Sequence, residues 1–166
     1  IAAGDKVCQL LATDAGLRDP GSFKAWLSDA GTDAASRFVN QGPWVRVDGI
    51  QIADELLDLG NGKLDSSIHV LETGAYMYGV GAWTGTLADG SADSSTCDGW
   101  HSAADTLYGR YGIANATLSN WTEHPVLRKC NAAQNSLYCL QDTPLLFFDD
   151  FESGDFWAWS TRLPAE

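Results

Sequence analysis

CNAAQNSLYCLQ, residues 130–141, holds two of the four cysteines in the chain and has the composition of a turn followed by a strand. Zinc sites usually present cysteines in C-x₂₋₄-C pairs, whereas eight residues separate Cys130 from Cys139, and Cys8 and Cys97 stand alone. A redox C-x-x-C is absent as well. The four cysteines therefore predict two disulfides formed in an oxidising compartment, and spacing alone leaves three pairings open.

The composition indicates one packed, acidic domain. Of the 166 residues 45 % are hydrophobic, and 22 acidic against 10 basic residues give a net charge of −12. The densest basic cluster is Arg128-Lys129, so we expect no nucleic-acid partner. No apolar run approaches the roughly 18 residues that cross a bilayer, so we expect no membrane insertion. The opening IAAGDKV lacks an initiator Met and a signal sequence, which we interpret as a processed or trimmed form.

Two helices are predicted early in the chain. Residues 2–16 have the spacing of an amphipathic helix, with its apolar face on Ala3, Val7, Leu10 and Leu11 and with Cys8 beside them. Residues 33–41 predict a second short helix, capped by Thr32 or Asp33 and ended by Gly42-Pro43.

Short strands and long loops make up the rest of the pattern. SFKAWLSD, residues 22–29, alternates with Phe23, Ala25 and Leu27 on one side, and SLYCLQ closes the domain as a strand. Asp48-Gly49 and Asn61-Gly62 mark tight turns, and residues 87–100 form a polar loop. The fold class is therefore α+β: two helices with an irregular antiparallel sheet and long loops.

Three segments carry a resemblance to a known family. GDKVCQLLATDAGLRDPGSFKAWLSD (residues 4–29), GAWTGTLADGSADSSTCDGW (81–100) and CNAAQNSLYCLQ resemble, in this order, the opening, central and closing parts of endostatin-like domains, in their bacterial secreted branch. That family has a variant of the C-type lectin-like fold. The resemblance covers a domain of residues 1–142 and implies the disulfides Cys8–Cys139 and Cys97–Cys130.

Several known activities of the family and its fold are not expected here. The chain has no arginine cluster for heparan sulfate, no histidine before Cys8 for the family's zinc, and no Glu-Pro-Asn or Gln-Pro-Asp for sugar-bound calcium. We predict no metal site and no cofactor, with calcium among three loop carboxylates as the alternative. The fold presents ligands on its long loops, so we expect contacts between residues 87 and 123, on Asp89, Asp93, Asp98 and Trp121.

The C-terminal residues 143–166 form an aromatic tail, whose FESGD motif and tryptophans resemble the tails of many exported bacterial proteins. Family members begin with a strand that pairs beside the closing strand, and this chain begins with the helix, so SLYCLQ is expected to have an unpaired edge. The tail of the same or a neighbouring subunit, or a strand removed from this form, would cover it. The candidate assembly residues are Leu145, Leu146, Phe147, Phe148, Phe151, Phe156, Trp157 and Trp159.

The predicted function is binding without catalysis. No G-x-S-x-G, phosphate loop or H-E-x-x-H occurs, and cysteines in disulfides cannot act as nucleophiles. We expect a secreted, extracellular or cell-surface binding or adhesion domain whose partner is a surface or matrix protein or glycan. The alternatives are a filament subunit that self-associates by C-terminal strand donation, and a carbohydrate-active enzyme.

Overall fold

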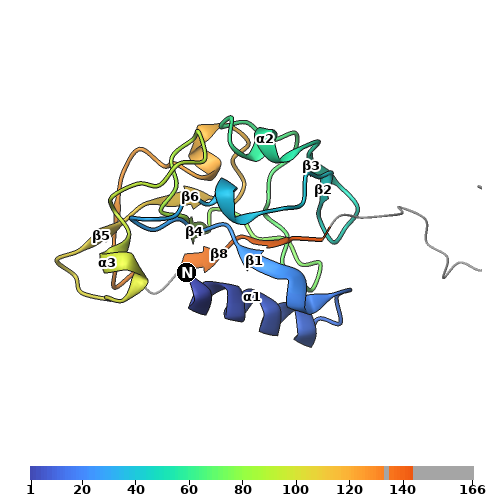
Figure 1. The fold of residues 1–166 in the computed structure, drawn as a ribbon, viewed down its shortest axis with the longest axis horizontal. Helices are drawn as coiled ribbons and strands as arrows, with labels where there is room; N and C mark the ends of the chain where they lie inside the picture. Colours follow the sequence, from blue (N-terminus) through green and yellow to red (C-terminus); the bar gives the residue numbers. More distant parts are fainter. Residues whose placement is uncertain (133–134, 144–166) are drawn as a thin grey trace, which may run out of the picture.

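The computed structural model describes residues 1–132 and 135–143 (Figure 1). The helices are α1 (Ala2–Asp14), α2 (Leu56–Leu59) and α3 (Cys97–Trp100), with 3₁₀ turns at Pro20–Ser22, Ala35–Arg37 and Ser119–Trp121. The strands are β1 (Phe23–Ala25), β2 (Trp44–Val45), β3 (Gln51–Ala53), β4 (Gly81–Trp83), β5 (Tyr108–Gly109), β6 (Tyr111–Ile113), β7 (Arg128–Lys129), β8 (Asn135–Leu137) and β9 (Cys139–Gln141). The predicted α+β class, with short strands and long loops, is confirmed.

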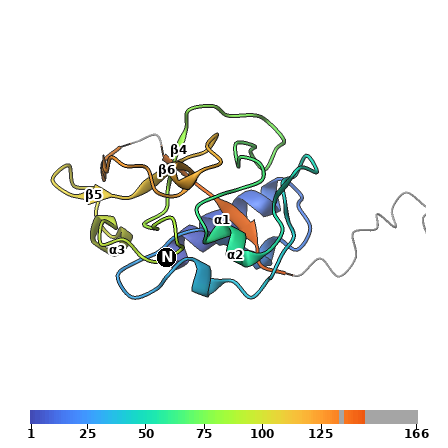
Figure 2. The same ribbon diagram turned by 90° about the horizontal axis from the view of Figure 1, so that it is seen from above.

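The strands form four small sheets. Three are antiparallel pairs, β1–β9, β2–β3 and β5–β7, and the fourth has the order β6–β4–β8, in which β4 and β8 run parallel. The helices α1 and α2 lie on opposite sides of these strands, and from above α2 lies in front of α1 (Figures 1 and 2). The expected irregular antiparallel sheet is therefore wrong for the β4–β8 pair, which is parallel. In the described residues, no helix is long and apolar enough to cross a membrane.

Helix α1 packs against β1 through small side chains. Cys8 and Ala12 are buried and, at four-residue spacing, continue a row that starts at Gly4. A Cβ atom at Gly4 would lie 3.3 Å from Ala25 Cβ, so the small row lets the helix approach the strand closely. The predicted apolar face is wrong, because Ala3, Val7, Leu10 and Leu11 are exposed.

Strand β1 alternates between two clusters of buried side chains, as its pattern predicts. Ala25 and Leu27 pack with Cys8 under α1, and Phe23 packs against the same cluster. Trp26 faces the other way into the main core and donates from Nε1 to Thr122 Oγ1 at 3.0 Å. Aromatic rings dominate this core, with Trp26 lying 5.4 Å from the ring of Trp121.

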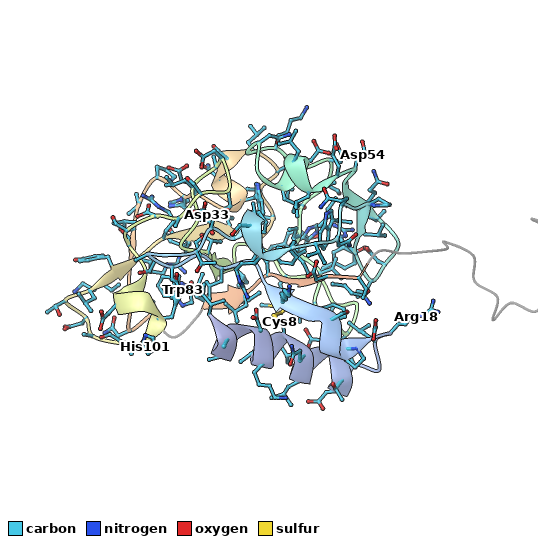
Figure 3. The ribbon with its side chains drawn as sticks, in the orientation of Figure 1. Cys8, Arg18, Asp33, Asp54, Trp83 and His101 are labelled. Carbon is cyan, nitrogen blue, oxygen red and sulfur yellow. A yellow bond between two sulfur atoms is a disulfide. The ribbon has the colours of Figure 1, made fainter. Side chains whose placement is uncertain are left out.

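Two disulfides join Cys8 to Cys139 and Cys97 to Cys130, the pairing that the resemblance implies. The first bridge ties α1 to β9, with the two Cα atoms 5.3 Å apart. Figure 3 shows Cys8 on the side of α1 that faces the strands. The second bridge joins α3 to the segment after β7.

The predicted second helix over residues 33–41 is wrong beyond one short turn. Only Ala35–Arg37 is helical, as a 3₁₀ turn whose N-cap is Ala34, without a side-chain cap from Thr32 or Asp33. The N–H groups of Val39 and Asn40 donate to Asp142 Oδ1 at 2.8 and 2.9 Å. A carboxylate far along the chain thus takes the donors that would continue a helix.

Candidate functional site

The described residues form a groove of about 870 Å³. Its lining comes mainly from α1 with the loop after it, the β2–β3 hairpin, the loop from Ile68 to Val80, and the closing strands with Thr143; β1, Asn40, β4 and Ala114 also contribute. Its apolar lining includes Val7, Leu11, Leu17, Phe23, Pro43, Val45, Val47, Ile68, Val70, Leu71, Met77, Val80, Leu137 and Leu140. The volume falls in the range of ligand-binding clefts, about 300–1,000 Å³.

The groove runs past the unpaired edge of β9. Within the described residues, β9 has one strand partner, β1. Trp26 N–H donates to Tyr138 C=O, and Asp142 N–H donates to Ser22 C=O, so even-numbered residues turn their backbone groups toward β1. Cys139 and Gln141 therefore turn theirs the other way, and both residues line the groove. Within the described residues, the edge of β9 away from β1 has no strand partner, and whether the tail covers it stays a prediction.

Three of the four backbone groups at this edge have no hydrogen-bond partner in the described part of the chain. They are the N–H and C=O of Cys139 and the N–H of Gln141, whereas the Gln141 carbonyl accepts from Asn40 Nδ2 at 3.3 Å. Backbone N–H and C=O groups need partners wherever water is displaced. An extended polypeptide lying along β9 would supply both a donor and an acceptor.

Side chains around the groove add to this chemistry. Val7 and Leu11 of α1 are 45 % and 39 % exposed and line the groove. The groove-lining Trp44 and Asn135 each carry a buried side-chain N–H donor, Nε1 and Nδ2, without an acceptor among the described residues. Trp121 Nε1 in the core is a third such donor, so these unsatisfied donors do not by themselves indicate an occupant of the groove.

One end of the groove carries charged and aromatic groups. Arg46 donates to Asp48 at 2.6 Å, and Tyr76 Oη donates to the same carboxylate at 2.7 Å. These hydrogen bonds hold the pKa of Asp48 well below its usual range. The ring of His69 lies 5.2 Å from that of Tyr76 and 5.0 Å from that of Tyr78. Arg46, positioned by Asp48, and His69 are thus fixed polar groups at the edge of an apolar lining.

A buried carboxylate fixes the end of β9. Asp142 accepts from Val39 N–H and Asn40 N–H, and its Oδ2 lies 2.5 Å from Lys24 Nζ. Burial raises the pKa of this carboxyl, but the hydrogen bonds from Asn40 and Lys24 outweigh burial and lower it. Asp142 is therefore charged at neutral pH and holds the last described turn of the chain beside Thr143, which lines the groove.

The predicted ligand loop is not a single site. Asp93 is buried and paired with Arg110 at 2.6 Å, and its pKa is lowered because hydrogen bonds from Ser95 and Arg110 outweigh the effect of burial. Asp89 bonds Ser91, while Asp98 is exposed. Within the described ranges, no three His, Cys, Asp or Glu side chains form a group that could hold a metal ion, which gives the calcium alternative no support.

Trp121 is a core residue, so its predicted role as a loop contact is wrong. It is 1 % exposed, and its ring lies 5.6 Å from that of Tyr138. The eight tail residues from Leu145 to Trp159 lie outside the described residues, so their predicted role in assembly stays a prediction.

Comparison with known protein families and with curated protein sequences finds no match to this chain. Sequence reasoning missed the groove residues of α1 and the β2–β3 hairpin. The signal that would have found Val7 and Leu11 is the row of small residues at positions 4, 8 and 12, which marks its own side of α1 as the buried one and places Val7 and Leu11 beside it.

Proposed function

We propose that this protein is an exported, non-enzymatic binding domain of endostatin-like, C-type lectin-like type that takes an extended apolar polypeptide into the groove along β9. One observation carries the proposal: the groove and the unpaired edge of β9 coincide. An extended peptide can add a strand at such an edge, because its backbone pairs with the edge while its side chains enter apolar pockets. The partner class is therefore a protein rather than a glycan.

The chemistry of the groove supports a polypeptide occupant. Its lining is mainly aliphatic, which suits apolar side chains, and the Cys139 and Gln141 backbone groups require donors and acceptors in alternation. Two disulfides and a net charge of −12 fit a domain that works outside the cytosol.

Four carboxyl groups lack the raised pKa that a glycosidase acid requires. A glycosidase acid needs a carboxyl group whose pKa is raised, so that it is protonated at working pH. Every described carboxyl group with a resolved shift has its pKa lowered: Asp48, Asp89, Asp93 and Asp142. The carbohydrate-active alternative therefore has no candidate acid among these residues.

A direct test uses the intact protein and a blocked peptide of its own residues 144–152, PLLFFDDFE, as the probe. The receptor is the full chain with Phe147→Asp and Phe148→Asp, so that its own apolar run does not compete. We expect saturable binding by fluorescence anisotropy, with slower hydrogen exchange at the amides of Cys139 and Gln141. A scrambled-sequence peptide is the control for composition.

Matched groove variants make the test specific. Val7→Gln with Leu11→Gln changes two exposed residues that line the groove, and Leu10→Gln with Val39→Gln changes two exposed residues that do not. We expect the groove pair to weaken peptide binding at least tenfold and the control pair to leave it unchanged. No binding, or equal loss in both pairs, would remove the proposal.

A further inference from the structure

We infer that the occupant of the groove is the apolar segment 145–148 of a second copy of this chain, so that copies join head to tail by strand donation. The inference rests on the proposed function and names its partner. The two parts that meet, a groove built around β9 and a segment beyond Thr143, are both carried by every copy.

The segment matches the groove in length and character. LLFF is apolar throughout and, as a strand, spans about 13 Å, against about 10 Å for the three residues of β9. Alternate side chains of the segment would enter the aliphatic lining, and its backbone would pair with Cys139 and Gln141.

The charged residues that follow the apolar segment are complementary to a charge at the groove. Asp149 and Asp150 follow the apolar run directly. Arg18 lines the groove, is exposed, and makes no ion pair within residues 1–132 and 135–143. Figure 3 shows its side chain extending outward from the loop after α1. The acidic pair would meet this guanidinium when the segment lies in the groove.

The chemistry of the connection favours a second copy over the same chain. A return along β9 needs a tight turn at Asp142-Thr143-Pro144, and the Asp142 N–H is already bonded to Ser22 C=O. A two-residue hairpin loop Thr143-Pro144 requires a positive φ at Thr143, and a three-residue loop from Asp142 to Pro144 requires one at Pro144. Proline is fixed near φ −65°, and a positive φ is strained for a β-branched residue. Thr143 is also biased toward extended backbone because it precedes proline.

Donor segment and acceptor groove are different surfaces, so the contact is heterologous. Such contacts propagate into open chains unless the rotation between copies happens to close a ring. This geometry turns the proposed binding domain into a subunit of an assembly outside the cell.

The test measures mass for the intact chain by light scattering and sedimentation over a hundredfold range of concentration. We expect the mass to rise with concentration beyond that of a dimer. Phe147→Asp with Phe148→Asp removes the donor, and Val7→Gln with Leu11→Gln weakens the acceptor, so each variant alone should be monomeric. Mixing the two should give a 1:1 dimer that grows no further, because the donor and the acceptor that remain functional pair only once. The Leu10→Gln, Val39→Gln control should assemble like the natural chain.

Other outcomes overturn the inference in distinguishable ways. An intact chain that stays monomeric at all concentrations, while the donor-altered variant binds the 144–152 peptide, refutes assembly and leaves the proposed function standing. If the intact chain is monomeric at all concentrations and also resists the added peptide, while the donor-altered variant binds it, the segment folds back on its own chain. A donor-altered variant that binds no peptide removes the proposed function itself.

Discussion

Replacing Asp142 with Asn should destabilise the fold by an amount that disappears in acid. The carboxylate accepts from two backbone N–H groups, of Val39 and Asn40, and pairs with Lys24. Asn offers one acceptor and turns an amide donor toward a neighbour that also donates. Hydrogen bonds to a charged group contribute about 1.5–3 kcal/mol each, and the Lys24 side chain is one-third exposed, so its pairing adds little. Both backbone N–H groups donate to Oδ1, so an Asn oxygen can keep both hydrogen bonds but without their charge assistance, which is about half of their strength. We therefore expect a loss of about 2–3 kcal/mol at pH 7.

The pH dependence gives this prediction its sign. The folded pKa of Asp142 lies below its ordinary value, so its stabilisation is fully present above the unfolded pKa of about 4. It is lost as the pH falls through the folded pKa, where the protonated carboxyl resembles the Asn amide. The gap between natural chain and variant should therefore shrink as the pH drops below about 4.

Urea unfolding, followed by circular dichroism with the disulfides intact, measures both effects. Asp14→Asn is the matched control, since Asp14 is exposed and makes no hydrogen bond or ion pair among the described residues. A loss below about 0.5 kcal/mol at pH 7 would refute the assigned role of the carboxylate. A gap that is equally large at low pH would refute the role of its charge.

Three further predictions concern the frame around the groove. In the chain-entropy limit, replacing Cys8 and Cys139 with Ala should lower the free energy of unfolding by about 5 kcal/mol, and replacing Cys97 and Cys130 should lower it by about 4 kcal/mol. Urea titration measures both losses. The reverse order would contradict the loop lengths of 131 and 33 residues. Gly112→Ala should lower the melting temperature by several degrees or more, because its Cβ would lie 1.7 Å from Trp121 O, whereas Gly21→Ala meets nothing within 4 Å and should be neutral in calorimetry. Arg110→Leu leaves the buried Asp93 carboxylate without its cation and should lower the free energy of unfolding by about 3–5 kcal/mol at pH 7. A loss under about 1 kcal/mol in chemical denaturation would show that the ion pair is dispensable.

The sequence pattern correctly predicts the elements that are determined by residues close together in the chain. The alternation in SFKAWLSD predicts β1 and the opposite directions of Ala25 and Trp26, and the Asp48-Gly49 dipeptide predicts the β2–β3 hairpin, in which Gly49 has φ +84°. These elements form as predicted because neighbouring residues determine them.

Distant contacts explain the failures. The helix expected over residues 33–41 stops because Asp142, about a hundred positions away, captures two of its N–H groups. The predicted strand SLYCLQ divides at Tyr138 into β8, which pairs with β4, and β9, which pairs with β1. No pattern within either segment carries this information, so single-sequence reasoning had no access to it.

Two of the α1 residues that were wrongly predicted to face the core line the groove instead. The spacing of Val7, Leu10 and Leu11 looks like a core-facing stripe, but Gly4, Cys8 and Ala12 form a narrower row that permits closer packing on β1. Once that row is buried, Val7 and Leu11, each one position before a buried residue, lie at the border of the interface and line the groove. The Cys8–Cys139 bridge then fixes this helix to the strand whose edge is open. Because the disulfide fixes α1 relative to the open edge of β9, little conformational entropy is lost in the protein when a strand binds between them. Strand addition gains most affinity under this condition.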